Sequence, residues 1–190
     1  MLTTGDGGAL VCKAVSDERR ARRLRWFGLD RQLDAVDECR WEQDIEEHGY
    51  KFHMNDIAAT IGCDQLRYLD GNLQKHQAHA AQYDDLLRRF HTVRPLQRSA
   101  DRSSAHWLYT VRVAQRSAFI AHLRLAGIAA SRVHVRNDRY TVFAPSVCDA
   151  LNGVAVFDAE QVNIPCGWWL SAQDVAAVMD ALCRFEAAPA

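Results

Sequence analysis

The sequence has little of what marks a secreted, metal-binding, membrane-spanning or nucleic-acid-binding chain. Its six cysteines include no CxxC pair and no zinc-type spacing. No apolar run approaches the roughly 20 residues that a membrane-spanning helix needs. Lys and Arg number 23 against 24 Asp and Glu, so the overall charge calls for neither nucleic acid nor an anionic membrane as partner. We therefore expect a cytoplasmic chain with reduced thiols, no signal peptide and no metal site.

The chain has 190 residues, of which 48% are apolar and 25% charged. This composition is typical of one globular domain or of a large piece of a bigger one. The start is unusual, because Met1 leads directly into a glycine-rich turn and the short apolar run Ala9–Cys12, which predicts a buried strand. A complete domain seldom starts in the middle of a sheet, so we expect the chain to be part of a larger fold.

The apolar pattern predicts α/β structure, in which a long amphipathic helix precedes a small subdomain of alternating strands and helices. Asn55 or Asp56 is a suitable N-cap for the long helix, which runs to Leu87 with a kink at Gly71. The other expected elements are a charged helix over 16–25 that ends near Gly28, a linker from Pro95 to Ser104, a strand over 106–113, a helix over 117–126 stopped by Gly127, strands over 128–135 and 162–165, and a closing helix over 172–185.

Two other clusters have simpler explanations than a binding site. Five arginines between Arg19 and Arg25 form the only basic cluster, but such clusters on helices are mostly solvated faces, and an acidic run follows from Glu42 to Glu47. His76 and His79 share a helix face, although a three-residue spacing without further ligands is weak support for a metal. We expect both clusters to lie on the surface, with no nucleic acid and no metal bound.

Several short motifs recur along the chain. The turn within LTTGDGGA (residues 2–9) has neither a GxGxxG fingerprint nor a Walker ending, and by itself such a turn is usually structural. It is followed by GYKFHMNDIAA (residues 49–59), by Gly62 with Gln65-Leu66, by HWLY (residues 106–109), by Gly127-Ile128 and by Ile164-Pro165. In order and spacing these motifs resemble the DegT/StrS-type nucleotide-sugar aminotransferases, which depend on pyridoxal 5'-phosphate (PLP). The resemblance extends over nearly all of the chain.

The resemblance implies the C-terminal part of an aspartate-aminotransferase-like fold. It divides the chain into a remnant of the large PLP-binding domain (residues 1–54), a long linking helix (55–95) and a small α/β subdomain (96–190). The Schiff-base lysine of the family would fall at or before Met1, and Lys13, Lys51 and Lys75 stand in the wrong sequence context to replace it. We therefore expect no catalytic residue in this chain and no transamination by the chain alone.

Asn55 is the residue that the resemblance assigns to the cofactor. In the family the asparagine of this block reaches across a dimer to the PLP phosphate of the other subunit. A helix N-terminus with free N–H groups also favours an anion. The alternative is that Asn55 only caps its helix.

His134 and Arg136 are the candidates for substrate binding. They stand in HVRND (residues 134–138), which a subset of the family carries together with a late PCGWW such as residues 165–169. Family analogy places this loop near the nucleotide-sugar diphosphate, and the arginine fork binds two phosphate oxygens at once. The alternative is an ordinary charged loop.

Two functions remain open. The first is a homodimeric aminotransferase that moves an amino group from an amino-acid donor to a nucleotide-linked keto sugar. The second is a truncated or split-gene half that dimerises and covers substrate without chemistry of its own. The sugar, the amino donor and the choice between transaminase and dehydratase chemistry stay undetermined.

Overall fold

The computed structural model describes residues 2–32, 43–146 and 151–188. By its internal contacts the chain divides into two compact units, Leu2–Tyr68 and the unit that starts at Leu69. We call them the N-terminal unit and the C-terminal unit and describe each by itself. No helix among the described residues has both the length and the apolar character needed to cross a membrane.

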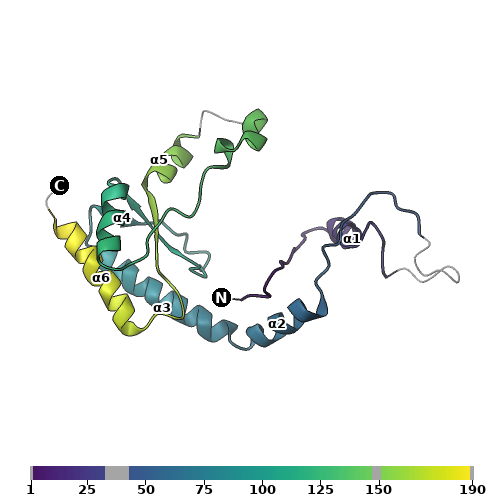
Figure 1. Cartoon of the computed structure of the whole chain (residues 1–190), viewed down its shortest axis with the longest axis horizontal. Coiled ribbons are helices and arrows are strands. Elements are labelled where there is room, and N and C mark those ends of the chain that lie inside the picture. Colours follow the sequence, from purple (N-terminus) through teal and green to yellow (C-terminus); the bar gives the residue numbers. More distant parts are fainter. Residues whose placement is uncertain (1, 33–42, 147–150, 189–190) are drawn as a thin grey trace. The chain divides into compact units, whose positions relative to one another are not determined.

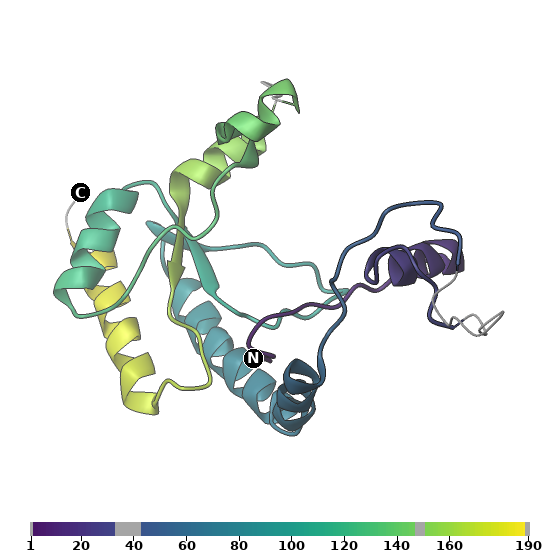
Figure 2. The ribbon, with the colours of Figure 1, turned by 45° about the vertical axis from the view of Figure 1, so that its right-hand side comes forward.

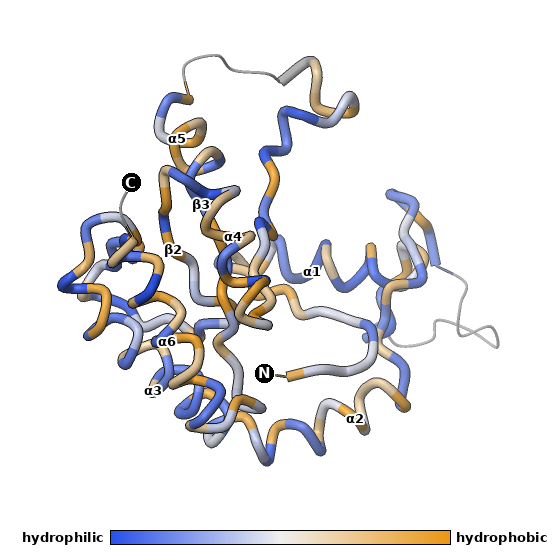
Figure 3. The backbone as a smooth tube through the Cα atoms, turned by 60° about the vertical axis from the view of Figure 1, so that its left-hand side comes forward, coloured by the Kyte–Doolittle hydropathy of each residue, from blue (hydrophilic) through white to orange (hydrophobic). Residues whose placement is uncertain are grey.

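The N-terminal unit contains the helices α1 (Val15–Leu24) and α2 (Asp56–Leu66) (Figure 1). Helix α1 has acidic side chains in its first turn and basic ones in its last, which complements the helix dipole. None of its residues is buried, and Figure 3 shows it as mostly hydrophilic. The charged helix predicted over 16–25 is thus confirmed.

The buried strand predicted at Ala9–Cys12 is wrong. Leu10 is 75% exposed and Val11 is 92% exposed, and the segment belongs to no sheet. A strand is stable only when another strand pairs with it. No segment within the described part of the chain does so here, and the apolar pattern alone could not reveal that.

The long helix predicted from Asn55 to Leu87 is divided in two. Helix α2 ends at Leu66, and α3 (Leu69–Leu87) begins three residues later. The N–H groups of Arg67 and Tyr68 donate to carbonyls three residues back, at 3.2 and 3.1 Å, so the last turn tightens before it ends. The interruption therefore lies at these two residues, whereas the predicted kink site, Gly71, lies within α3.

The C-terminal unit is built on a three-stranded antiparallel sheet of order β1-β2-β3. Its strands are β1 (Val93–Pro95), β2 (Tyr109–Val113) and β3 (Gln161–Ile164). The register pairs Val93 with Val113, Val111 with Val162 and Tyr109 with Ile164, and all six side chains are buried. One face of the sheet is therefore apolar, because alternate residues of a strand point to the same side.

Helices α3, α4 (Arg116–Leu125) and α6 (Ala172–Ala187) join the apolar face in one core. Helices α4 and α6 lie side by side (Figure 1), and a capping box of Ser171 and Asp174 begins α6. Helix α5 (Asn152–Glu160) runs directly into β3 (Figure 2), and two short 3-10 helices, η1 (Asn137–Arg139) and η2 (Thr141–Ser146), precede it.

The expected fold class is confirmed, as are the helices at α4 and α6 and the strand at β3. The strand expected over 106–113 starts only at Tyr109, and Val93–Pro95 pairs as β1, so the linker begins after Pro95. The strand expected over 128–135 is absent, and Ser131 alone forms a bridge, to Asn163. The division into 1–54, 55–95 and 96–190 stays a prediction.

Glu186 in the last turns of α6 ties that helix to the start of the sheet. Its carboxylate accepts hydrogen bonds from the backbone N–H groups of His91, Thr92 and Val93, over 2.6–3.2 Å. Burial opposes ionisation of Glu186, but these three donors together lower its pKa below the ordinary 4.5. The ionised carboxylate thus stabilises the folded unit.

We expect Glu186→Gln to lower the free energy of unfolding at pH 7 by about 1–2 kcal/mol, because a neutral amide accepts weaker hydrogen bonds. The stabilisation by Glu186 is fully present above about pH 4.5 and is lost as pH falls through the lowered folded-state pKa. Urea unfolding at pH 7 and pH 3 measures both effects. Asp85→Asn, at an exposed carboxylate paired with Arg88, is the control. If Glu186→Gln lowered the free energy of unfolding by the same amount at pH 7 and at pH 3, this role of the ionised carboxylate would be refuted.

Candidate functional site

The glycine-rich turn near the start of the chain lines a pocket of the N-terminal unit. The pocket has a volume of about 350 Å³ and is lined by residues 2–9 and Met54. Thr4 Oγ1 donates a hydrogen bond of 3.0 Å to the Asp6 carbonyl. Gly7 has φ +147°, and a Cβ there would lie 2.8 Å from Thr4 Oγ1. Glycine is therefore required at this position of the turn.

The same turn lies against helix α2 and the segment before it. A Cβ on Gly62 of α2 would lie 3.1 Å from Thr4 Cγ2, and one on Gly7 would lie 3.5 Å from Met54 Cε. The fold thus brings LTTGDGGA and GYKFHMNDIAA together, although 39 residues separate them in the sequence.

Asn55 begins helix α2 as its N-cap. Its backbone is extended, and its Oδ1 accepts a hydrogen bond of 2.9 Å from the Ala58 N–H. The predicted cap is confirmed, and it uses the oxygen of the amide while the NH₂ group stays a donor. The first N–H groups of the helix add further donors, whereas Asp56 places a negative charge in the same turn. Capping and anion binding by Asn55 are therefore compatible.

Backbone hydrogen bonds join residues 24–28 to residues 47–52 in the N-terminal unit, and we call this pairing the clasp. The Phe27 N–H donates to the Tyr50 carbonyl at 3.0 Å, and the Tyr50 N–H donates to the Leu24 carbonyl at 2.7 Å. This pairing holds the end of α1 against the segment that leads into α2.

Two glycines allow the clasp to close. A Cβ on Gly49 would lie 2.2 Å from the Gly28 nitrogen, and a Cβ on Gly28 would lie 2.4 Å from the Glu47 carbonyl oxygen. Gly28 also has φ +87°. A side chain at either position would collide with backbone, which cannot move without breaking the pairing.

We expect Gly49→Ala to destabilise the N-terminal unit by about 2 kcal/mol or more, since both the collision and the lost pairing oppose folding. Hydrogen exchange of the amides at 24–28 and 47–52 should rise. Gly8→Ala is the matched control, because nothing lies within 4 Å of its Cβ position. Equal stability of the two variants would show that the clasp contributes nothing.

The polar face of the sheet in the C-terminal unit holds the loop that carries the predicted substrate residues. Asn163 of β3 exchanges backbone hydrogen bonds of 2.8 and 3.2 Å with Ser131, and its Oδ1 accepts one of 2.9 Å from the Val133 N–H. Gln161 Nε2 donates to the His134 carbonyl at 2.8 Å. Side-chain amides thus take the place of ladder bonds, which is why the strand predicted over 128–135 is reduced to a single bridge.

His134 and Arg136 occupy different environments in this loop. His134 is exposed, with its ring 6.2 Å from that of Trp107 in an edge-to-face contact. Arg136 is half-buried, and its fork is bound to the Asp138 carboxylate, with Nε to Oδ1 at 2.9 Å. Two nitrogens of the Arg136 guanidinium therefore already donate within the loop. The structure thus brings His134 together with Trp107, and Arg136 together with Asp138.

Asp158 of α5 is a buried carboxylate that sequence reasoning missed. It is 4% exposed and accepts hydrogen bonds from Arg132 (3.3 Å) and Arg139 (2.8 Å), while its carbonyl accepts one from Arg116. Two arginines of the loop 132–139 and Arg116 of α4 thus bind one residue, and both ends of the loop are fixed to α5. No local motif announces this contact, because its partners come from distant positions.

Trp107 is held in place by a polar network around the HWLY motif. The His106 carbonyl accepts a hydrogen bond of 2.8 Å from His76 Nδ1, and His106 has φ +48°. Tyr109 donates to Asp84, and burial raises its pKa above the usual range. Trp107 itself is 57% exposed, and its ring contacts His134 of the loop. His76, expected on the surface, is fully buried here.

We expect Asp158→Asn to loosen the loop 132–139, because an amide cannot pair with two guanidinium groups. Hydrogen exchange at 132–139 should rise, and the free energy of unfolding should fall by about 1–3 kcal/mol. Asp101→Asn, at an exposed carboxylate paired with its neighbour Arg102, should change neither. Unchanged exchange in Asp158→Asn would mean that the loop is held by β3 alone.

Within the described residues, no group of three or more His, Cys, Asp or Glu side chains could hold a metal ion. Asn55 belongs to the N-terminal unit, whereas His134 and Arg136 belong to the C-terminal unit. Their assignment to cofactor and substrate stays a prediction.

Solved structures resemble the chain over most of its length. The sugar aminotransferase CalS13 from Micromonospora echinospora superposes with a TM-score of 0.86 at 36% identity, over 95% of this chain and 48% of that one.

Curated relatives agree with that likeness. The UDP-4-amino-4,6-dideoxy-N-acetyl-beta-L-altrosamine transaminase of Campylobacter jejuni is 26% identical over 188 residues, which is 95% of this chain and 48% of the relative. The dTDP-4-dehydro-2,3,6-trideoxy-D-glucose 4-aminotransferase of Saccharopolyspora spinosa is 35% identical over 92 residues, which is 46% of this chain and 24% of the relative.

The chain therefore spans at most about half the length of these relatives. A comparison with protein families matches residues 1–183 to the DegT/DnrJ/EryC1/StrS aminotransferases. That match covers almost the whole sequence, so the chain belongs to the DegT/DnrJ/EryC1/StrS aminotransferase family.

Proposed function

We propose that this chain is the C-terminal half of a PLP-dependent aminotransferase that transfers an amino group from an amino acid to a nucleotide-linked keto sugar. The observation that carries the proposal is the match over 95% of the chain to the sugar aminotransferase CalS13. Relatives that act on UDP- and dTDP-linked sugars support the substrate class. The lysine that bonds the cofactor would come from the other half of the complete enzyme.

The residues of the N-terminal unit suit the phosphate of PLP. When bound, PLP supplies the electron sink for the chemistry at the amino-bearing carbon. Asn55 has its oxygen committed to the cap, which leaves its NH₂ group free to donate. This donor stands at a helix N-terminus, where anions are stabilised. In a homodimer Asn55 of one subunit would hold the cofactor phosphate of the other.

The loop 132–139 is our candidate for contact with the nucleotide sugar. His134 and Trp107 offer an exposed imidazole and an indole ring that a base or sugar can pack against. Arg136 is bound to Asp138, so it would position the loop unless that pair opens to accept a phosphate.

Activity is tested by joining the chain to the lysine-bearing half of CalS13 and supplying a nucleotide-linked 4-keto sugar, glutamate and PLP. We expect formation of 2-oxoglutarate and of the amino sugar by the joined protein, and none by the 190-residue chain alone. An inert joined protein that still binds PLP would favour the alternative function, a dimerising half without chemistry.

Asn55→Ala and Asn55→Ser separate the cap from the phosphate contact in the joined protein. Serine is a good N-cap but lacks the NH₂ donor, whereas alanine lacks both. If Asn55 binds the phosphate, both variants should raise the PLP dissociation constant about tenfold or more. Only Asn55→Ala should also lower stability, by about 1 kcal/mol. PLP affinity unchanged in both variants would leave Asn55 as a cap alone.

A further inference from the structure

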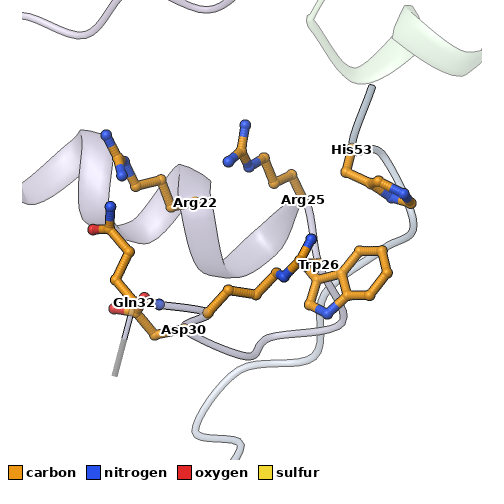
Figure 4. Close-up of a pocket in the computed structure, with 7 residues that line it drawn as sticks. Arg22, Arg25, Trp26, Asp30, Gln32 and His53 are labelled. Carbon is orange, nitrogen blue, oxygen red and sulfur yellow. The ribbon is translucent and has the colours of Figure 1, made fainter. Parts of the chain in front are cut away.

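A small basic pocket lies beside the clasp in the N-terminal unit (Figure 4). Its volume is about 90 Å³, which suits one small group rather than a whole nucleotide. Arg22 projects from α1 and Arg25 from the C-cap of that helix, while His53 approaches from the segment before α2 and lies next to Trp26. The lining residues are Arg22, Arg25, Trp26, Asp30, Arg31, Gln32 and His53.

The charges that line this pocket are mostly positive. Three of its residues are arginines and one, Asp30, is acidic. The Asp30 carboxylate accepts the backbone N–H of Gln32 at 2.9 Å, and Arg22 donates to Glu18 at 2.6 and 3.0 Å. Among the described residues, the guanidinium group of Arg25 has neither an ion pair nor a hydrogen bond. Arg25 is thus a positive group at the pocket whose donors are not committed.

His53 adds a second unsatisfied group. Its Nδ1 is buried and has no hydrogen-bond partner within the described part of the chain. The ring stands edge-to-face against Trp26 at 4.2 Å, which fixes its orientation. The His53 ring therefore forms a fixed wall of the pocket.

The other arginines of the basic cluster behave differently. Arg20 pairs with Glu47 at 2.5 Å and Arg23 approaches Glu46 at 3.9 Å, on exposed surface. Arg19 is exposed and does not line the pocket. The cluster therefore divides into a solvated face with Arg19, Arg20 and Arg23 and a pocket lined by Arg22 and Arg25.

We propose that this pocket binds a phosphate group, held by the uncommitted guanidinium of Arg25, while Arg31, stacked on Trp26 at 4.9 Å, contributes a second positive charge. The inference rests on the proposed function, which offers two sources of this chemistry: the phosphate of PLP and the diphosphate of the nucleotide sugar. Arginine recognises phosphate oxygens through paired donors, and His53 lies two residues before Asn55.

Calorimetric titration of the 190-residue chain with inorganic pyrophosphate tests the pocket. We expect saturable one-site binding that Arg25→Gln weakens about tenfold, equivalent to about 1.4 kcal/mol. Arg19→Gln removes the same charge from the same helix and should weaken binding less than twofold. Circular dichroism confirms that each variant keeps its helices.

Competition experiments then identify the source of the phosphate. If PLP displaces pyrophosphate and pyridoxal does not, the site takes the cofactor phosphate. If UDP or dTDP displaces it and PLP does not, the site takes the nucleotide diphosphate. Absence of pyrophosphate binding, or equal losses in Arg25→Gln and Arg19→Gln, would overturn the proposal. Pyrophosphate binding that depends on Arg25, alongside an inactive joined protein, would refute the proposed function while leaving this site intact.

Discussion

Packing on one face of a short antiparallel sheet organises the C-terminal unit. Val111 of the central strand is fully buried and stands opposite Val162 across the ladder. Because side chains alternate along a strand, this apolar contact sends Thr110, Gln161 and Asn163 to the opposite face. A slip of one residue would exchange the two faces and bury the wrong set. The register that builds the core therefore also presents the groups that hold the loop 131–134.

Buried polar side chains give that loop its shape. Asn163 supports both Ser131 and Val133, and its Nδ2 donates a hydrogen bond of 2.8 Å to Thr110 Oγ1. Asp158 holds the loop from the other side. A buried polar group without its partners is costly, so a set with its hydrogen bonds formed restricts the loop to one conformation. The loop therefore holds His134 in an exposed position.

In the N-terminal unit, the close approach of two backbone segments fixes the local conformation, as side-chain packing does in the C-terminal unit. Gly28 and Gly49 approach so closely that only hydrogen fits between their backbones. The clasp sets the position of Trp26 and, through it, of His53. The pocket with Arg25 takes His53 from the segment just before the cap at Asn55, so one short stretch of chain contributes to both features.

The sequence by itself determined the family, the α/β class and the helices α1, α4 and α6, because these depend on local periodicity, caps and long motifs. It also predicted Asn55 as a cap, since capping needs only the residues of one turn.

Only the tertiary structure decided which apolar runs become strands. Residues 9–12 have strand-like composition but pair with no other segment that the structure describes. In the stretch 128–135, hydrogen bonds to the side chains of Asn163 and Gln161 take the place of a strand. The sequence likewise did not predict the buried carboxylate of Asp158 or the close backbone contact at Gly49. Each depends on groups brought together from distant parts of the chain, and periodicity carries no information about such contacts.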